Sequence, residues 1–249
     1  MRALRILLIL VVIFGGLFVA ADRAAVYFAE GQVADRIRSS QGLDSQPQVS
    51  IKGFPFLTQV LGSSLDEVDI SLDGVSATAD GHQVQVTEVS AELRNVEIDS
   101  SFSSATAGQA TGSAHISYAD LAKSAPKGAT VGYAGPDRAA KGQVKVSGPL
   151  AEVLEGAGID MPSSVRALLE GREVTAYSTV SLAGGDTVRL RAEALPELPV
   201  PGLNDQVRDV VNYDLKIDGL PSTIKLDKVT ASETGLQFSG TGTNVSLAG

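Results

Sequence analysis

The stretch Gly53-Phe54-Pro55-Phe56-Leu57 places three large apolar side chains around a proline. Pro55 fixes its own φ, lacks a backbone N–H, and disfavours a helical conformation at Phe54. The stretch is therefore neither the interior of a helix nor a central strand. Its apolar side chains must either be buried in a core or be offered to an apolar ligand, and the surrounding sequence bears on that choice.

Upstream lies an N-terminal segment typical of exported proteins. Arg2 and Arg5 precede an unbroken apolar run from Ile6 to Ala21, and positive charge before such a run is the pattern of an export signal. As a helix the run spans roughly 24 Å, which is less than the hydrocarbon thickness of about 30 Å. A cleaved signal and an uncleaved anchor both fit residues 1–21. Either one places residues 22–249 outside the cytoplasmic membrane.

An amphipathic helix is predicted over residues 22–39, between the apolar run and the proline stretch. Asp22 is its predicted N-cap, and Gly42 is expected to follow its end. Apolar residues recur at helical spacing at Val26, Ala29, Val33 and Ile37. The helix would therefore present one apolar face to the rest of the protein.

Downstream, alternating polar and apolar residues predict a series of strands. From Glu67 to Asp73 every second residue is apolar, which marks a strand with one dry and one wet face. The alternation from Val84 to Ile98 changes phase twice, which predicts β-bulges. Further strands are predicted over 143–147, 174–182, 188–194, 213–217, 224–226 and 236–238. The turn at 184–186 would join two of them as a hairpin.

Short helices are predicted over residues 58–61, 118–123 and 163–170, residues 203–211 are interpreted as a short amphipathic segment, and the stretches 100–113 and 126–140 are interpreted as loops. No strand-helix-strand rhythm is present, which argues against a parallel doubly wound sheet. The predicted fold class is α+β: a large curved antiparallel sheet with the long N-terminal helix against its concave face. Residues 22–249 are expected to form a single domain.

Composition argues against several classes of function. A net charge of −9 is opposite to the basic footprint of nucleic-acid binders. Cysteine is absent, which removes disulfides, thiolate catalysis and Cys-bound metals. His82 and His115 have no partner at metal-ligand spacing, and no nucleophile elbow or phosphate-binding glycine loop occurs. We therefore expect no metal and no cofactor.

Carboxylates leave one enzymatic alternative open. Acidic residues are frequent between Ser64 and Asp99, and glycoside hydrolysis needs a pair of carboxylates. Most of them lie on the polar phase of strands, where a solvated outer face explains them. We expect a protein without enzymatic activity. The alternatives are an envelope enzyme that acts on glycolipid through paired carboxylates and a structural envelope domain with a filled core.

The order of the elements resembles that of the LmeA family, actinobacterial cell-envelope proteins that bind phospholipids. The resemblance rests on the export segment, the amphipathic helix, Gly53 to Gln59 and the acidic strand 65–72, and it continues more loosely to the closing strands over 221–243. It implies a fold similar to tubular lipid-binding domains, in which a curled sheet and a helix enclose an apolar groove. It also implies anionic, phosphoinositide-type phospholipids as ligands and a role in maintaining lipoglycans, and it brings no catalytic residues.

A lipid site is also favoured on physical grounds. Aromatic residues make up only 5% of the chain, so few bulky rings are present to fill the concave side of a long one-sided sheet. Burying ten acyl methylenes would contribute on the order of 8 kcal/mol before ordering costs. The predicted acyl site is lined by Val26, Val33, Ile37, Phe54, Phe56, Leu57 and Leu61. Core packing explains each of these residues equally well.

Basic residues suggest where a phosphate headgroup would bind. The segment from Lys123 to Lys145 carries a local positive charge in an acidic protein, and such a segment attracts anionic membrane surfaces. The predicted headgroup contacts are Arg36, Arg38, Lys52, Lys123, Lys127 and Lys141. We thus expect a phospholipid carrier of the cell envelope that acts at the membrane surface. It would be tethered by residues 6–21 or released after cleavage.

Overall fold

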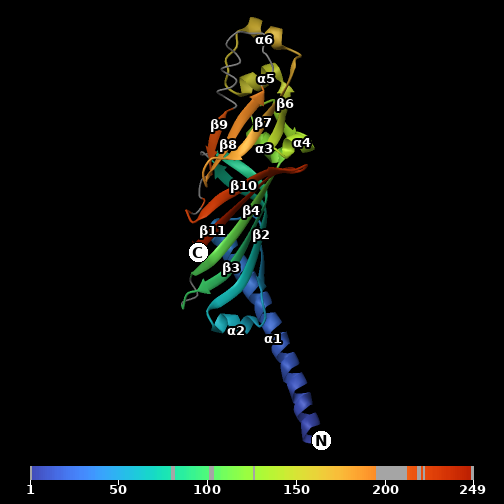
Figure 1. The fold of residues 1–249 in the computed structure, drawn as a ribbon, viewed down its shortest axis with the longest axis vertical. Coiled ribbons are helices and arrows are strands. Elements are labelled where there is room, and N and C mark those ends of the chain that lie inside the picture. Colours follow the sequence, from blue (N-terminus) through green and yellow to red (C-terminus); the bar gives the residue numbers. More distant parts are fainter. Residues whose placement is uncertain are drawn as a thin grey trace. The chain divides into compact units, whose positions relative to one another are not determined.

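The computed structural model describes residues 2–79, 82–100, 104–125, 127–194, 212–217, 220 and 222–247 (Figure 1). The helices are α1 (Arg2–Gln41), α2 (Phe56–Leu61), α3 (Tyr118–Ser124), α4 (Pro136–Ala139), α5 (Leu150–Gly156) and α6 (Ser163–Leu169). The strands are β1 (Gln48–Lys52), β2 (Ser64–Ala79), β3 (His82–Ile98), β4 (Ala105–Ser117), β5 (Thr130–Tyr133), β6 (Gln143–Pro149), β7 (Glu173–Leu182), β8 (Thr187–Ala194), β9 (Tyr213–Lys216), β10 (Ile224–Ala231) and β11 (Gly235–Ser246).

The strands of the described residues form two sheets. A six-stranded sheet has the order β1-β2-β3-β4-β11-β10, and a five-stranded sheet has the order β5-β6-β7-β8-β9. β1 pairs antiparallel with β2, with Ile51 opposite Val68. The predicted hairpin is confirmed, because β7 and β8 pair antiparallel with Leu182 opposite Val188. The α+β class with a long N-terminal helix and extensive antiparallel sheet is confirmed, although the strands are divided between two sheets.

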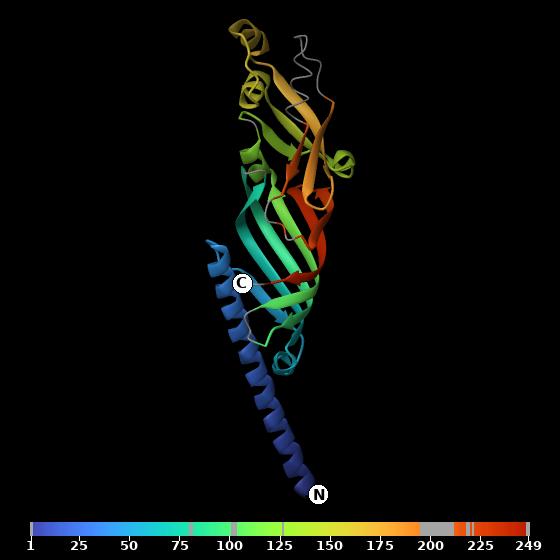
Figure 2. The same cartoon turned by 90° about the vertical axis from the view of Figure 1, so that its left-hand side faces the viewer.

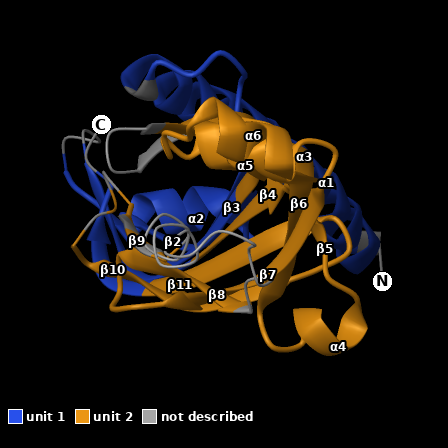
Figure 3. Ribbon diagram, turned by 90° about the horizontal axis from the view of Figure 1, so that it is seen from above, with its two compact units in different colours: residues 1–72, 90–111, 242–249 blue, residues 73–89, 112–241 orange. Residues whose placement is uncertain are grey.

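The chain forms two compact units, coloured separately in Figure 3. Unit 1 comprises residues 1–72, 90–111 and 242–249, and unit 2 comprises residues 73–89 and 112–241. The chain passes from one unit to the other inside β2, β3, β4 and β11. The expectation of one domain over residues 22–249 stays a prediction, because neither unit is a continuous segment of the chain.

Helix α1 continues without a break through the apolar run and the amphipathic segment. Asp22 therefore lies inside a helix and does not cap its start, so the predicted N-cap was wrong. The physical reason is local: Ala20, Ala21, Ala24 and Ala25 surround Asp22, and alanine has the highest helix propensity of all residues. Gly42 follows the end of the helix as predicted, with φ of 63°.

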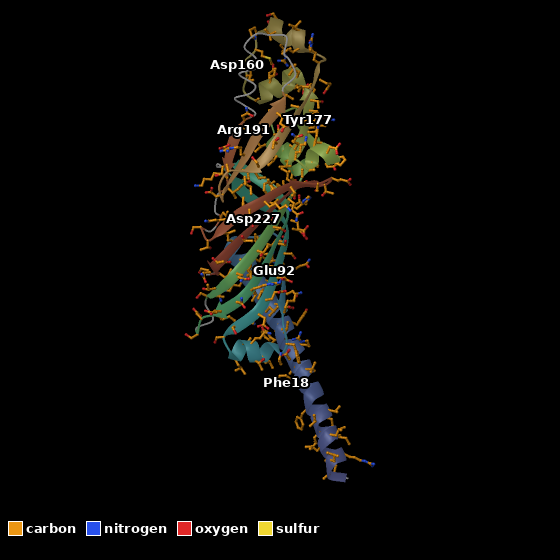
Figure 4. The ribbon with its side chains drawn as sticks, viewed as in Figure 1. Phe18, Glu92, Asp160, Tyr177, Arg191 and Asp227 are labelled. Atoms are coloured by element: carbon orange, nitrogen blue, oxygen red, sulfur yellow. The ribbon has the colours of Figure 1, made fainter. Side chains whose placement is uncertain are left out.

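The N-terminal part of α1 extends away from the strands of unit 1 (Figures 1 and 2). Its large apolar side chains from Leu4 to Val19 are exposed, and Figure 4 shows them projecting around the helix at and before Phe18. By length and composition the helix is apolar enough to cross a membrane. This agrees with an export signal or an anchor and does not distinguish between them.

The loop predicted over residues 100–113 was wrong for its described part, because β4 begins at Ala105. Ala107 and Ala110 are buried, and a Cβ atom on Gly108 would lie 3.3 Å from the Cβ of Asn95. The small residues of this stretch therefore permit close packing against β3. The stretch 126–140, also interpreted as a loop, contains β5 and α4.

Strand β3 accommodates its change of phase at Asn95. Leu93 and Val96 are both buried although three positions separate them. Asn95 between them has φ of 51°. A residue in this left-handed conformation is typical of a β-bulge, which shifts the alternation of inward-facing and outward-facing side chains by one residue. Helix α5 was not predicted, whereas α2, α3 and α6 lie close to their predicted positions. The short amphipathic segment 203–211 lies outside the described residues.

Unit 2 has two packed apolar clusters of its own. One joins the sheet strands through Val144, Val180, Val188, Leu236 and Phe238. The other packs α5 against α6 through Leu150, Ala151, Leu154, Ile159 and Leu169. The apolar residues predicted to bind lipid lie in neither cluster, because they all belong to unit 1.

Candidate functional site

The proline stretch is fastened to α1 through a buried carboxylate. Asp22 is fully buried, and its Oδ1 accepts a hydrogen bond from the backbone N–H of Leu57 at 2.9 Å. Helix α2 begins after Pro55 and has no side-chain cap of its own. Because the first N–H groups of a helix lack partners within the helix, Asp22 supplies from α1 the acceptor that an N-cap residue would normally supply.

Arg23, the next residue of α1, holds the preceding part of the stretch. Its Nη2 donates to Oδ2 of Asp22 at 2.6 Å and to the carbonyl oxygen of Gly53 at 3.4 Å. Its guanidinium carbon lies 5.4 Å from the centre of the Phe54 ring, within the range of a cation–π interaction. One side chain thus neutralises the buried carboxylate and orients the exposed ring.

Two further links fix β1 and α2. Oε1 of Glu30 accepts a hydrogen bond from the backbone N–H of Ile51 at 2.8 Å, which ties β1 to α1. Gln59 of α2 donates to the carbonyl oxygen of Lys52 at 3.3 Å and accepts from the backbone N–H of Asp66 at 2.8 Å. The backbone around the proline stretch is therefore held from α1, β1 and the start of β2.

The structure divides the seven predicted acyl-site residues by depth. Val26 and Phe56 are buried, with 7% and 6% of their surface exposed. Ile37 and Leu57 are half-buried. Val33, Phe54 and Leu61 are exposed, the last two by 58% and 85%. The structure brings Phe56 and Leu57 to α1 through Asp22, whereas Phe54 and Leu61 present their side chains outward.

Two exposed aromatic residues of α1 were missed in the sequence. Tyr27 and Phe28 are exposed by 76% and 70%, and their ring centroids lie 6.3 Å apart in an edge-to-face arrangement. Both lie off the apolar stripe of the amphipathic helix, with Phe28 nearly opposite it, and within two turns of the apolar run. That combination, aromatic residues off the stripe and just outside an apolar run, was the available signal.

The six predicted headgroup residues are exposed and divided equally between the units. Arg36, Arg38 and Lys52 belong to unit 1, where Lys52 pairs with Asp69 at 3.3 Å. Lys123, Lys127 and Lys141 belong to unit 2, where Lys123 pairs with Asp120 at 2.6 Å. Ion pairing therefore offsets two of the six charges locally.

Several carboxylates of the described residues take part in surface ion pairs and capping contacts. Glu67 and Glu92 both pair with Arg94, at 3.2 and 2.5 Å. The pKa of Asp120 is held at about 2 by hydrogen bonds from Lys123, Ser117 and Thr87. Arg189 and Arg191 likewise hold the pKa of Asp214 at about 2, against the opposing effect of desolvation. A glycosidase-type general acid needs a raised pKa, so neither of these two carboxyl groups suits that role.

Comparison with known proteins agrees with the resemblance seen in the sequence. The model of the LmeA-like phospholipid-binding family matches residues 20–241, which is most of the chain. No curated protein and no solved structure matches the chain. The match begins at the end of the apolar run and includes α2 and the proline stretch with their anchoring residues on α1. The chain therefore belongs to the LmeA-like phospholipid-binding family.

Proposed function

We propose that this protein binds phospholipid without chemical turnover and holds the acyl chains against the apolar surface formed by α1, the proline stretch and α2. The observation that carries the proposal is the combination of a firmly held backbone with exposed apolar side chains. Asp22 and Arg23 fix the stretch, yet Phe54 and Leu61 remain uncovered. Membership of a phospholipid-binding family supports lipid as the molecule that covers them.

The depth of the side chains suggests how an acyl chain would lie. Val26 and Phe56 belong to the core and would form the floor beneath the ligand. Ile37, Leu57 and Val33, which are partly or largely accessible, would contact it directly. Each methylene removed from water contributes about 0.8 kcal/mol, so contact with part of one acyl chain suffices for binding without special polar chemistry.

The exposed basic residues of unit 1 supply candidate contacts for the phosphate. Arg36 and Arg38 lie near the end of α1, and Lys52 ends β1. An arginine fork binds phosphate through two parallel hydrogen bonds, so an anionic headgroup of the phosphoinositide type suits this set. Lys123, Lys127 and Lys141 of unit 2 would bind a headgroup or attract an anionic membrane surface.

The proposed place of action is the outer side of the cytoplasmic membrane. The apolar run would direct export and would either tether the protein or be removed. A carrier or storage role in lipid or lipoglycan maintenance of the cell envelope follows from this placement and from the family. The pKa values of Asp120 and Asp214 are lowered, whereas the general acid of a glycolipid-cleaving enzyme needs a raised one, so these groups do not favour the enzymatic alternative.

The direct test is organic extraction of the purified full chain followed by mass spectrometry. Co-purified phospholipid, with uptake of added fluorescent phospholipid, is the expected result. A protein that carries no lipid and takes none up would overturn the proposal in favour of a structural envelope domain. Phe54→Asp should lower uptake several-fold, whereas Leu168→Asp, at an exposed leucine of α6 in unit 2, should leave it unchanged.

A further inference from the structure

We propose that Tyr27, Phe28, Phe54 and Leu61 form a membrane-contacting face of unit 1, here named the interfacial face. This face would rest on the outer leaflet of the same bilayer that holds the apolar run Ile6–Ala21. The inference adds to the proposed function, because it assigns a contact surface with the bilayer itself and does not depend on whether the protein also takes up lipid.

The four side chains are large, apolar and exposed, and separate contacts link them to the part of α1 between Asp22 and Phe28. Arg23 lies one helical turn before Tyr27, so the two share one side of α1. The Phe54 ring lies under the guanidinium of Arg23, and Phe28 packs edge-to-face on Tyr27. Leu61 belongs to α2, whose first turn is hydrogen-bonded to Asp22. Single exposed apolar residues need no explanation, but four large ones at this end of unit 1 do.

The position of the group along α1 identifies the bilayer as its partner. The run Ile6–Ala21 spans roughly 24 Å, about 6 Å less than the hydrocarbon core. Four more residues of helix make up this difference, which places the hydrocarbon edge near Ala25. Tyr27 and Phe28 lie about 9–11 Å beyond Ala21 along the axis and so fall within the headgroup layer, where tyrosine is enriched in membrane proteins.

The hydrogen bond to Asp22 holds the start of α2 at the level where the apolar run ends, near the hydrocarbon edge. Asp22 directly follows the apolar run, and it holds the backbone of Leu57. A carboxylate near the hydrocarbon edge requires a compensating charge, and Arg23 supplies it at 2.6 Å. The arrangement therefore suits the edge of a bilayer and holds Phe54 and Leu61 beside it.

The absence of cysteine allows a direct measurement of depth. Single cysteines at Phe54 and Leu61 would carry a nitroxide label in the full chain reconstituted into phosphatidylcholine vesicles. Ser40→Cys is the matched control, because Ser40 is exposed on the same helix about 28 Å beyond Ala21 along the axis. All three positions are on the surface, so the labels should leave the fold intact.

The labels at Phe54 and Leu61 should be more accessible to oxygen, which partitions into lipid, than to a water-soluble nickel chelate. The label at Ser40 should show the opposite preference. Preference for the nickel chelate at all three positions would overturn the interfacial face. Protection at Phe54 and Leu61 that rises with the protein-to-lipid ratio would overturn it in favour of contact with a second copy. A failure of lipid extraction would leave this outcome unaffected, so the two proposals fail separately.

Discussion

The carboxylate of Asp22 accepts a hydrogen bond from the backbone N–H of Leu57 at 2.9 Å, across 35 positions of sequence. An aspartate directly after an apolar run suggests the cap of a new helix, but here the helix continues and the carboxylate serves a different one. The contact fixes the proline stretch against α1, and every proposal about the apolar surface of unit 1 depends on it.

Replacing Asp22 by leucine should therefore loosen α2. We expect Asp22→Leu to lower the midpoint of thermal unfolding by a few degrees and to expose residues 53–62 to limited proteolysis. Asp22→Asn keeps an acceptor oxygen and should show a smaller effect. Asp44→Leu, at an exposed aspartate just after α1, should show none, and equal effects at positions 22 and 44 would refute the role given to Asp22.

The two phenylalanines of the proline stretch should differ sharply in their contribution to stability. Phe56 is buried and Phe54 is exposed. Phe56→Ala should lower the free energy of unfolding by about 3–5 kcal/mol, whereas Phe54→Ala should cost less than about 1 kcal/mol, mainly through the lost cation–π contact. Urea denaturation of both variants measures the difference. Similar losses would mean that Phe54 is part of the core.

Phe56→Asp is for the same reason a poor probe of lipid uptake, because it would damage the fold and the binding surface together. Substitutions at Phe54 and Leu61 separate the two effects, since these side chains already face outward. Asp69→Ala is a suitable low-impact comparison, because Asp69 makes a partly exposed ion pair with Lys52. It should leave lipid uptake close to that of the unaltered chain.

Gly53 should not tolerate a side chain. It has φ of +91°, and a Cβ atom there would lie 2.5 Å from Nε2 of Gln59. Gly53→Ala should lower the free energy of unfolding by about 1–2 kcal/mol from backbone strain alone and should disturb the Gln59 hydrogen bonds. Gly31→Ala is the matched control: beyond the backbone of its own helix turn, no atom lies within 4 Å of its added Cβ, and in a helix it should raise stability by up to about 1 kcal/mol. If denaturant unfolding showed that both substitutions change the free energy of unfolding in the same direction, this account would be contradicted.

Asp120 should make stability depend on pH in the acid range. Hydrogen bonds from Lys123, Ser117 and Thr87 lower its pKa from 3.8 to about 2 in the folded protein. A depressed carboxyl pKa stabilises the fold above the unfolded value, and this contribution is lost as pH falls from about 4 to about 2. In denaturant unfolding between pH 5 and pH 2, the free energy of unfolding of Asp120→Asn should fall less steeply with decreasing pH than that of the unaltered chain. An unchanged slope in that variant would argue against the network.

The basic residues of unit 2 should differ in their contribution to anionic lipid binding. Lys123 is neutralised by Asp120, whereas Lys127 and Lys141 are exposed and make no ion pair with a described residue. A free lysine near an anionic surface contributes about 1 kcal/mol. Lys127→Ala and Lys141→Ala should therefore each weaken binding to vesicles containing phosphatidylinositol by roughly five-fold at low salt, and Lys123→Ala by less. Identical affinities for all three variants would remove these residues from the headgroup contacts.

Local patterns in the sequence predicted the elements that depend on local physics. The dry face of β2 is visible in its alternation, and the turn at 184–186 is visible in its glycines, so β2 and the β7–β8 hairpin were placed correctly. Strand β4 was missed because small residues such as Ala107 and Gly108 are typical of loops. They are needed there because Asn95 of β3 packs closely against Gly108, and this contact is not visible in the sequence.

The site residues remain a prediction, and the sequence did not show how deeply each of them is buried. Helical spacing placed Val26 and Val33 on one face, yet the first is buried and the second exposed, because periodicity gives a direction and not a distance from solvent. The hydrogen bonds from Asp22 to Leu57, from Arg23 to Gly53 and from Glu30 to Ile51 were not predictable, since each joins residues that are brought together only by the fold.

The four passages of the chain between the two units have a practical consequence for anyone dissecting this protein. Each passage lies within a strand, and unit 1 combines residues from both ends of the sequence with residues 90–111, which interrupt unit 2. No single cut yields either unit intact, so fragments designed as N-terminal and C-terminal halves should not be soluble. Point substitutions in the whole polypeptide, rather than deletions, are the sound route to separating the roles of the two units.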